Sequence, residues 1–114
     1  QAVGDTRWMG ADLNTDKGSN LPIEFTLKQN YPNPFNPTTD ISFSLDKTSE
    51  INLTIFNLLG QKVRVLANGT KNAGYHTMTW NGQDDMGKAV SAGVYLYQLT
   101  NGKQTVTKKM ALMK

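Results

Sequence analysis

Hydrophobic and polar residues alternate along most of this chain with a period of two. This period places successive side chains on opposite faces of an extended strand, so each alternating stretch predicts a strand with one buried face. The stretches lie at residues 23–27, 41–45, 51–55, 76–80, 94–99 and 104–113, with a shorter one around Val63 and Val65. No segment shows the period of an amphipathic helix. The pattern therefore predicts an all-β chain.

Turn-forming dipeptides separate the predicted strands. They are Gly60-Gln61, Asn68-Gly69, Asn81-Gly82 and Asn101-Gly102. Short strands joined by such turns are typical of sandwiches, so we expect an immunoglobulin-like antiparallel β-sandwich of about seven strands. Asn68-Gly69 should end the short strand at Val63. Trp80 shares one face of its strand with His76 and Met78 and should anchor the core.

The first part of the chain has a different composition. Residues 1–22 are rich in Gly, Asp, Asn and Ser without a sustained period, so we expect a linker or the tail of a preceding domain, followed by one domain at 23–114. Asp12, Asn14 and Asp16 carry oxygens at alternate positions, as at the start of a calcium loop. Gly18 comes one place too late, and Ile23 stands where that loop needs Glu. A flexible acidic linker is therefore the favoured interpretation.

Composition narrows the chemistry further. With 38% hydrophobic residues among 114, the chain can supply one modest core. It contains no cysteine, which excludes disulfides and cysteine-based zinc sites. It also has no run of about 18 apolar residues, so no membrane-spanning helix is predicted.

Positive charge gathers toward the C-terminus. The net charge is +3, and the residues after Asp85 include no acid but five lysines: Lys88, Lys103, Lys108, Lys109 and Lys114. Such a region can contact nucleic acid, an anionic surface or an acidic receptor. Lysine on an edge strand also prevents unwanted sheet pairing, which is the alternative role. Because the lysines are not interleaved with stacking aromatics, nucleic-acid binding has little support.

No combination of residues predicts catalysis. Asp84 and Asp85 are adjacent in a loop, where carboxylates more often cap backbone amides than form an acid–base pair or a metal site. His76 is the only histidine, and alone it predicts a turn or strand residue bonded to backbone. We therefore expect neither an enzyme nor a cofactor.

The aromatic residues allow two interpretations. Tyr31, Tyr75, Trp80, Tyr95 and Tyr97 can form a sugar-stacking platform or pack in the core and at edges. Aromatic residues are 9% of the chain, an ordinary proportion, so packing is the stronger interpretation. The platform keeps open an alternative function, an accessory carbohydrate-binding β-sandwich of a secreted hydrolase.

Six short motifs follow one another along the chain: Gln29–Pro37, Asn57–Gln61, Ala73–His76, Trp80–Gly87, Ser91–Tyr95 and Lys108–Lys114. Their defining residues are Asn30, Tyr31, Pro32, Asn33, Pro34, Phe35, Asn36, Pro37, Gly60, Gly74, His76, Trp80, Gly82, Gly93 and Tyr95. Together they resemble the C-terminal sorting domain of cargo exported by the Bacteroidetes-type type IX (Por) secretion system. The Asp-rich loop and the Gly-Val-Tyr strand are also similar to the immunoglobulin-like domain of the flagellar hook-capping protein, which supports the fold but not the same function.

The resemblance implies a domain that follows a secreted enzyme or adhesin, its N-terminally fused cargo. It implies recognition by the outer-membrane type IX translocon and removal by a sortase-like peptidase. The protein would then pass through the periplasm to the cell surface or the extracellular medium. The implied sorting signal lies in the final strand and tail, at Lys108, Lys109, Met110, Leu112 and Lys114.

Physical reasoning supports that position for the signal. A strand at the end of the chain offers unpaired backbone groups and alternating lysines to a receptor. Met110 and Leu112 should fix this strand to the sandwich. The proline-rich segment Pro32-Asn33-Pro34 should stiffen the start of the sandwich and hold the linker clear.

Overall fold

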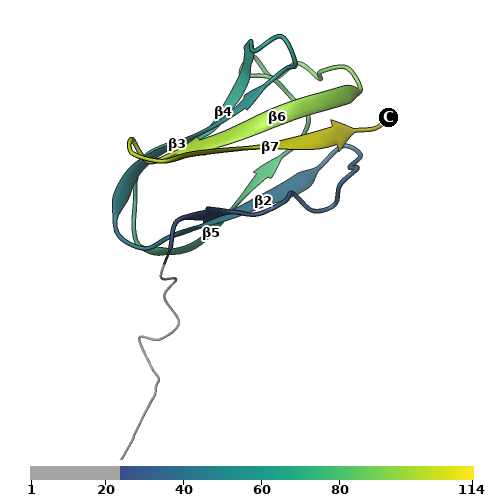
Figure 1. The fold of residues 1–114 in the computed structure, drawn as a ribbon. Coiled ribbons are helices and arrows are strands. Elements are labelled where there is room, and N and C mark those ends of the chain that lie inside the picture. The colour runs from purple at the N-terminus through teal and green to yellow at the C-terminus, as the bar shows by residue number, and fades with distance from the viewer. Residues whose placement is uncertain (1–23) are drawn as a thin grey trace, which may run out of the picture.

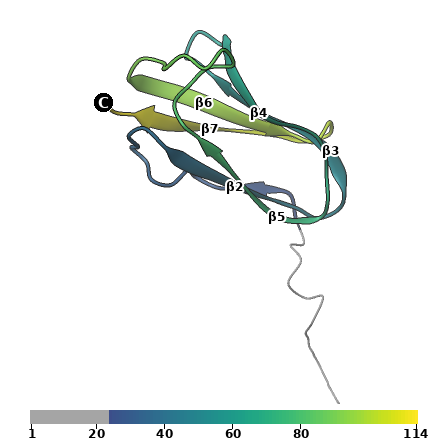
Figure 2. The same ribbon diagram turned by 180° about the vertical axis from the view of Figure 1, so that it is seen from behind.

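The computed structural model describes residues 24–114, which form seven strands and no helix. The strands are β1 (Thr26–Leu27), β2 (Thr39–Leu45), β3 (Ser49–Phe56), β4 (Lys62–Lys71), β5 (Gly74–Trp80), β6 (Gly93–Thr100) and β7 (Thr105–Leu112). They build two antiparallel sheets, β1-β2-β5 and β4-β3-β6-β7, stacked face to face (Figure 1). Figure 2 shows the same two layers from behind. The predicted immunoglobulin-like antiparallel sandwich is confirmed.

The alternation in the sequence becomes the two inward faces of the sandwich. On β2, for example, Ile41 and Phe43 are buried, whereas Asp40 is exposed on the outer face. Trp80, at the end of β5, is completely buried, as predicted. The core consists of Leu27, Phe35, Ile41, Phe43, Leu45, Ile51, Leu53, Ile55, Ala67, Trp80, Tyr95, Tyr97, Leu99, Met110 and Leu112. Because each buried large side chain contributes about 1.5–3 kcal/mol, this core holds the sheets together.

The prediction of a turn at Asn68-Gly69 is wrong. These residues lie inside β4, where Asn68 pairs with Asn52 of β3 and Gly69 pairs with Ile51. A bulge at Leu66 precedes them, and Gly69 has a φ of +128°. The chain reverses only after Lys71, before it crosses to the other sheet. Pairing along the whole of β3 outweighs the local turn preference of the dipeptide, because each added residue extends the ladder.

Several segments that are distant in the sequence meet at one end of the sandwich, where β3, β5 and β7 finish (Figure 1). We call this the loop end. It holds residues 29–38, 57–61 and 81–92 together with the last residues of β7. The short β1 begins at the opposite end (Figures 1 and 2).

One prediction and one disfavoured alternative concern residues before the described range. The linker at residues 1–22 and the calcium loop at Asp12, Asn14 and Asp16 lie outside the residues that the structure describes.

Candidate functional site: the edge of the C-terminal strand

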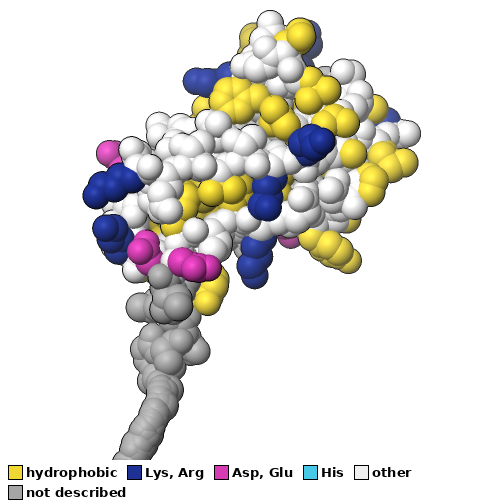
Figure 3. Space-filling view, viewed as in Figure 1, with side chains coloured by type: hydrophobic (Ala, Val, Ile, Leu, Met, Phe, Trp, Pro, Cys, Tyr) yellow, Lys and Arg dark blue, Asp and Glu magenta, His cyan; other side chains and the backbone are white. Residues whose placement is uncertain are grey.

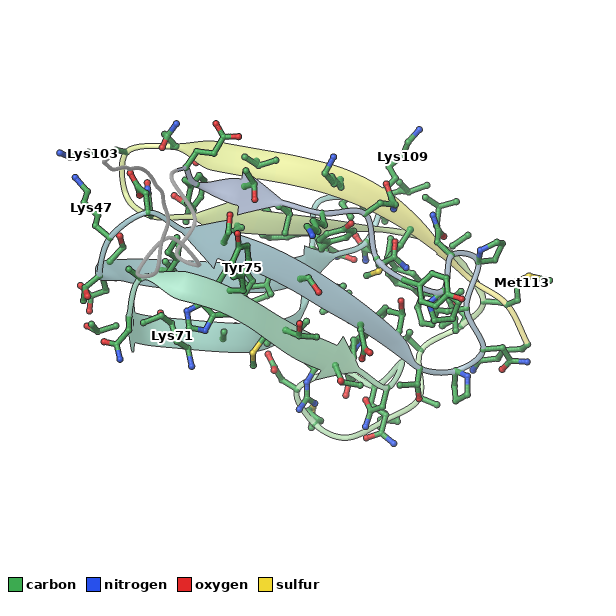
Figure 4. All side chains as sticks on the ribbon, turned by 90° about the horizontal axis from the view of Figure 1, so that it is seen from below. Lys47, Lys71, Tyr75, Lys103, Lys109 and Met113 are labelled. Atoms are coloured by element: carbon green, nitrogen blue, oxygen red, sulfur yellow. The ribbon has the colours of Figure 1, made fainter. Side chains whose placement is uncertain are left out.

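The residues of the implied sorting signal lie on and just after β7, which is an edge strand paired with β6. Met110 and Leu112 point into the core. Lys108 is half-buried on the same inward face, because it precedes Met110 by two residues. Lys109 is exposed and points away from the sandwich (Figure 4), and Lys114 is exposed beyond the strand. The two adjacent lysines therefore do not present their charges in the same direction.

Residues 29–37, which we call the edge segment, cover the outer side of β7. Phe35 N–H donates to Ala111 O (3.0 Å), and Met113 N–H donates to Phe35 O (2.8 Å), forming a parallel bridge between Phe35 and Leu112. Side chains extend this contact. Ala111 N–H donates to Asn33 Oδ1 (3.0 Å). The edge segment thus acts as a short added strand along the last part of β7.

Gln29 adds a further contact, from Nε2 to Lys109 O (2.7 Å), across 80 positions of sequence. The expectation that the C-terminal strand offers unpaired backbone groups is therefore wrong between Lys109 O and Met113 N. Among the described residues, the outward backbone groups of Thr105 and Thr107 have no hydrogen-bond partner. Within residues 24–114, the edge segment therefore leaves the outer edge of β7 open from Thr105 to Lys109 N–H.

Tyr31, which lies between Gln29 and Asn33, pairs with the opposite sheet. Tyr31 and Asp40 exchange two backbone hydrogen bonds of 2.9 and 2.8 Å at the start of β2. The sequence predicted that Pro32-Asn33-Pro34 stiffens the start of the sandwich and holds the linker clear; in the structure, the segment around it also joins β2 to β7. It closes one open side of the sandwich and fixes the position of β7 relative to both sheets.

Asn30 and Thr39 form a buried polar network beneath the edge segment. Asn30 Nδ2 donates to Thr39 Oγ1 (2.9 Å) and to Pro32 O (3.1 Å), and Thr39 Oγ1 donates to Pro32 O (2.8 Å). Asn30 Oδ1 accepts from Gln29 Nε2 (2.7 Å). These buried polar groups have partners, so the network stabilises one conformation of the segment.

Tyr97 of β6 attaches the start of the edge segment to the core. Its hydroxyl accepts a hydrogen bond from Asn30 N–H (2.8 Å) and donates one to Lys28 O (2.8 Å). Burial raises the pKa of the Tyr97 phenol above its ordinary value of 10.0, and the hydrogen bond from Asn30 opposes this rise. Nothing in the periodicity of the sequence identifies this contact, because it joins residues more than 60 positions apart.

Three aromatic rings anchor the middle of the edge segment. The Phe35 ring lies 5.6 Å from Trp80, and Trp80 lies 5.5 Å from Tyr95 in an edge-to-face arrangement. The indole Nε1 donates to Gln83 O (2.8 Å). Gly82 in the same loop approaches the edge segment so closely that a Cβ there would lie 3.2 Å from Pro37 O.

Gly82 also has a φ of +77°, a backbone conformation that favours glycine. The residues of the first and fourth motifs, which the sequence shows as separate, are therefore one packed unit.

The remaining motif positions serve backbone geometry or packing. Gly60 has a left-handed φ of +83° in its turn, and Gly74 and Gly93 begin β5 and β6. His76 stacks on Phe43 with ring centroids 5.2 Å apart, and its Nε2 hydrogen-bonds Asn72 O (2.8 Å), as expected for a structural histidine. Pro32, Pro34, Asn36 and Pro37 are exposed on the edge segment.

The paired aspartates cap backbone groups, as the sequence indicated. Asp84 Oδ1 accepts from Met86 N–H and Lys88 N–H, at 2.9 and 3.0 Å. Asp85 Oδ1 accepts from Val65 N–H (3.1 Å) at the outer edge of β4. This loop covers one end of the β4 edge much as the edge segment covers one end of β7.

The aromatic residues divide between core and surface. Trp80, Tyr95 and Tyr97 belong to the core, which confirms packing for these three, whereas Tyr31 and Tyr75 are exposed. Within residues 24–114, no group of three His, Cys, Asp or Glu side chains lies close enough to hold a metal ion. The same residues contain no helix that is long and apolar enough to span a membrane.

A shallow hollow of about 190 Å³ lies where the edge segment meets the outer face of β6 and β7. It is lined by Asn33, Val94, Lys109, Met110 and Ala111. Lys109 is its only charged residue, so the hollow combines a small apolar surface with one positive charge.

Comparison of the sequence with known protein families identifies a match over most of the described residues. Residues 30–105, from the buried Asn30 to the start of β7, match the FlgD Ig-like domain family. The chain belongs to this family. No curated protein matches the sequence of this FlgD Ig-like domain.

Solved structures with the same fold include FlgD itself. FlgD from Xanthomonas campestris, described in connection with the hook capping that is essential for flagellar assembly, is 21% identical with a TM-score of 0.54 over 82% of this chain and 70% of its own. FlgD from P. aeruginosa is 21% identical with a TM-score of 0.52, over 65% of this chain and 57% of its own.

Two further structures come from Porphyromonas gingivalis. Dimeric latent PorU is 15% identical with a TM-score of 0.61 over 75% of this chain. PorZ, described as an essential surface component of the type-IX secretion system, is 20% identical with a TM-score of 0.50 over 79% of this chain. The chain spans only 9% of PorU and 11% of PorZ, so it corresponds in fold to one small part of each.

Proposed function

We propose that this FlgD Ig-like domain is a sorting module, which directs an N-terminally fused cargo protein through the outer-membrane type IX export machinery. The six sequence motifs support this proposal, and so does the similarity in fold to parts of PorU and PorZ. The observation that carries it is the contact between the first and last motifs, where Phe35 and Asn33 bind Ala111 and Met113. A signal at the end of the chain is thereby held in one conformation.

A fixed signal suits recognition of a folded domain. Ordering a flexible tail at the moment of binding opposes affinity, whereas a strand already held on both sides avoids this loss of entropy. In this proposal the receptor contacts Lys109 with its adjacent hollow, Lys114, and the open edge at Thr105 and Thr107. Lysines attract an acidic receptor and set the orientation of approach. Lys108 contributes less because it is half-buried.

The later steps of the proposal follow the resemblance. A sortase-like peptidase removes the domain, and the cargo passes from the periplasm to the cell surface or the extracellular medium. In this proposal the domain performs no catalysis and holds no cofactor, and its role is to present a surface.

Export of a fusion protein tests this proposal. The domain is placed behind a neutral passenger with a Sec signal peptide, in a host with the type IX machinery. Deletion of Lys108–Lys114 is a poor test alone, because it also removes Met110 and Leu112 from the core. The sharper change is Lys109→Glu with Lys114→Glu, which reverses two exposed charges. We expect the passenger to accumulate in the periplasm.

A matched control uses the opposite end of the sandwich. Lys47→Glu with Lys103→Glu reverses two exposed lysines that lie far from Lys109 (Figure 4), so export should continue. Circular dichroism verifies that both double variants fold. Export of the Lys109 and Lys114 variant at the level of the original domain would show that these lysines do not form the signal.

A further inference from the structure

Two turns at the loop end repeat the same construction. In the first, Asn57 Oδ1 accepts hydrogen bonds from Leu59 N–H (2.9 Å) and Gln61 N–H (3.0 Å). Gly60 N–H donates to Asn57 O (3.0 Å), and Asn57 N–H donates to Gln61 O (3.0 Å). Gly60 closes the turn with a φ of +83°.

The second turn, at residues 84–88, has the same bonds. Asp84 Oδ1 accepts from Met86 N–H (2.9 Å) and Lys88 N–H (3.0 Å). Gly87 N–H donates to Asp84 O (3.0 Å), and Asp84 N–H donates to Lys88 O (2.9 Å). Gly87 has a φ of +81°. In both turns, an Asn or Asp side chain and a glycine with a positive φ hold the backbone in its conformation. The turn therefore places no requirement on the side chain of the residue before the glycine.

Both turns carry a large apolar residue at this unconstrained position. Leu59 is 84% exposed and Met86 is 86% exposed, and the neighbouring Leu58 is 64% exposed. We call these three residues the apolar tip. Because the backbone does not require them and they are exposed, folding does not explain them. Exposed apolar side chains that cluster mark an interaction surface.

Hydrogen bonds place the two turns next to each other. Asp85 N–H donates to Val63 O (3.1 Å), Val65 N–H donates to Asp85 Oδ1 (3.1 Å), and the Arg64 guanidinium donates to Asp84 O (3.0 Å). The residues of β4 in these bonds directly follow the first turn. Figures 1 and 2 show both turns side by side at the top of the molecule.

Charged residues of both signs flank the apolar tip. Lys62 and Lys88 are exposed and follow the two turns directly. The carboxylates of Asp84 and Asp85 accept hydrogen bonds from backbone amides of their own loop and of β4. Figure 3 shows hydrophobic side chains at the top of the molecule with Lys and Arg side chains beside them. The surface is a projection whose margin carries Lys62, Arg64 and Lys88 beside Asp84 and Asp85, so the positive charges exceed the negative ones by one.

We propose that the apolar tip inserts into the headgroup region of an anionic lipid bilayer, with Lys62 and Lys88 contacting lipid phosphates. A projection of apolar side chains with adjacent lysines suits a bilayer surface, where apolar groups reach the acyl boundary and cations remain with the headgroups. A protein pocket is a different partner, which the test below distinguishes. Because only three side chains insert, binding is weak and reversible. The inference does not depend on the proposed sorting function.

Flotation of the chain with lipid vesicles tests the inference. One set of vesicles contains phosphatidylcholine alone, and the other contains phosphatidylglycerol as an anionic component. We expect binding to the anionic vesicles that decreases as salt is added, because salt screens exposed charges. Leu58→Ser with Leu59→Ser should weaken binding by at least about tenfold, on the scale for exposing a buried leucine. Lys62→Gln with Lys88→Gln should remove most of the salt dependence.

A control variant lies on another surface. Tyr75→Ser removes a side chain that is 66% exposed on β5, away from the loop end (Figure 4), and should bind as the original chain does. Absence of binding to anionic vesicles overturns the inference, and so does unchanged binding of the double leucine variant. If that variant reduced export in cells while the original chain ignored vesicles, the apolar tip would contact a protein and the lipid assignment would be wrong.

Discussion

Removing one hydroxyl group tests whether the edge segment depends on its buried anchor. The Tyr97 hydroxyl lies in the core and holds both Asn30 N–H and Lys28 O at 2.8 Å. Tyr97→Phe retains the ring and its packing but removes both hydrogen bonds. The two backbone groups then need other partners, and the local environment decides whether they find them.

The expected loss follows from the exposure of each group. Asn30 is buried, with 2% of its surface exposed, so its N–H remains without a partner, at a cost of about 1–3 kcal/mol. Lys28 is exposed, so its carbonyl can bind water instead, and this loss is below about 1 kcal/mol. We therefore expect Tyr97→Phe to lower the free energy of unfolding by about 1–4 kcal/mol. That is a large part of the stability of a small domain.

Urea denaturation measures this change, with the slope of the transition checked to be constant. Tyr75→Phe is the matched control: its hydroxyl is exposed on β5, so its effect should stay within about 0.5 kcal/mol. Hydrogen exchange at Phe35 and Met113 should accelerate in Tyr97→Phe, because these amides belong to the contact between the edge segment and β7. A stability equal to that of Tyr75→Phe would refute the role of Tyr97 as an anchor.

Three further outcomes are expected. Because the pKa of Tyr97 is raised in the folded state, the unfolded chain loses the phenol proton at a lower pH than the folded chain does. The contribution of this proton to stability is therefore complete below about pH 10 and is lost as the pH rises through the folded-state pKa. Above about pH 10, the urea midpoint should fall more steeply with pH for the original chain than for Tyr97→Phe. Gly82→Ala should destabilise the domain more than Gly87→Ala. Both substitutions place alanine at a left-handed φ, which costs about 1–2 kcal/mol. Of the two new Cβ atoms, only the one at position 82 meets a neighbour, Pro37 O at 3.2 Å. Equal unfolding midpoints would contradict this. Trp80→Ala should lower the free energy of unfolding by about 3–5 kcal/mol, since the indole is fully buried, and a loss below about 1 kcal/mol would contradict its place in the core.

Much of the sandwich was determined by local sequence alone. The period of two sets which side chains face inward, so residues such as Ile41 and Trp80 were predictable as core. The capping role of Asp84 was predictable as well, because an Asx side chain bonds backbone amides two and four positions ahead. These features depend on neighbours in the chain, which the sequence displays directly.

The turn at Asn68-Gly69 shows where local preference fails. The dipeptide favours a hairpin, yet β3 offers partners beyond it, and the ladder continues to Lys71. A local preference is worth about 1 kcal/mol, which several additional strand pairs outweigh. The length of the partner strand, which the dipeptide does not contain, decides the outcome.

Only the tertiary structure shows which residues cover and anchor the C-terminal strand at the candidate site. The sequence predicted a sorting signal in the final strand, and it correctly expected Met110 and Leu112 to fix that strand to the core. It did not indicate that Asn33 and Phe35 cover the same strand, or that Tyr97 anchors their segment. Nor did it show that two turns 27 positions apart, beginning at Asn57 and Asp84, stand side by side. Periodicity describes what each residue faces, whereas long-range pairing depends on how the whole chain closes its core.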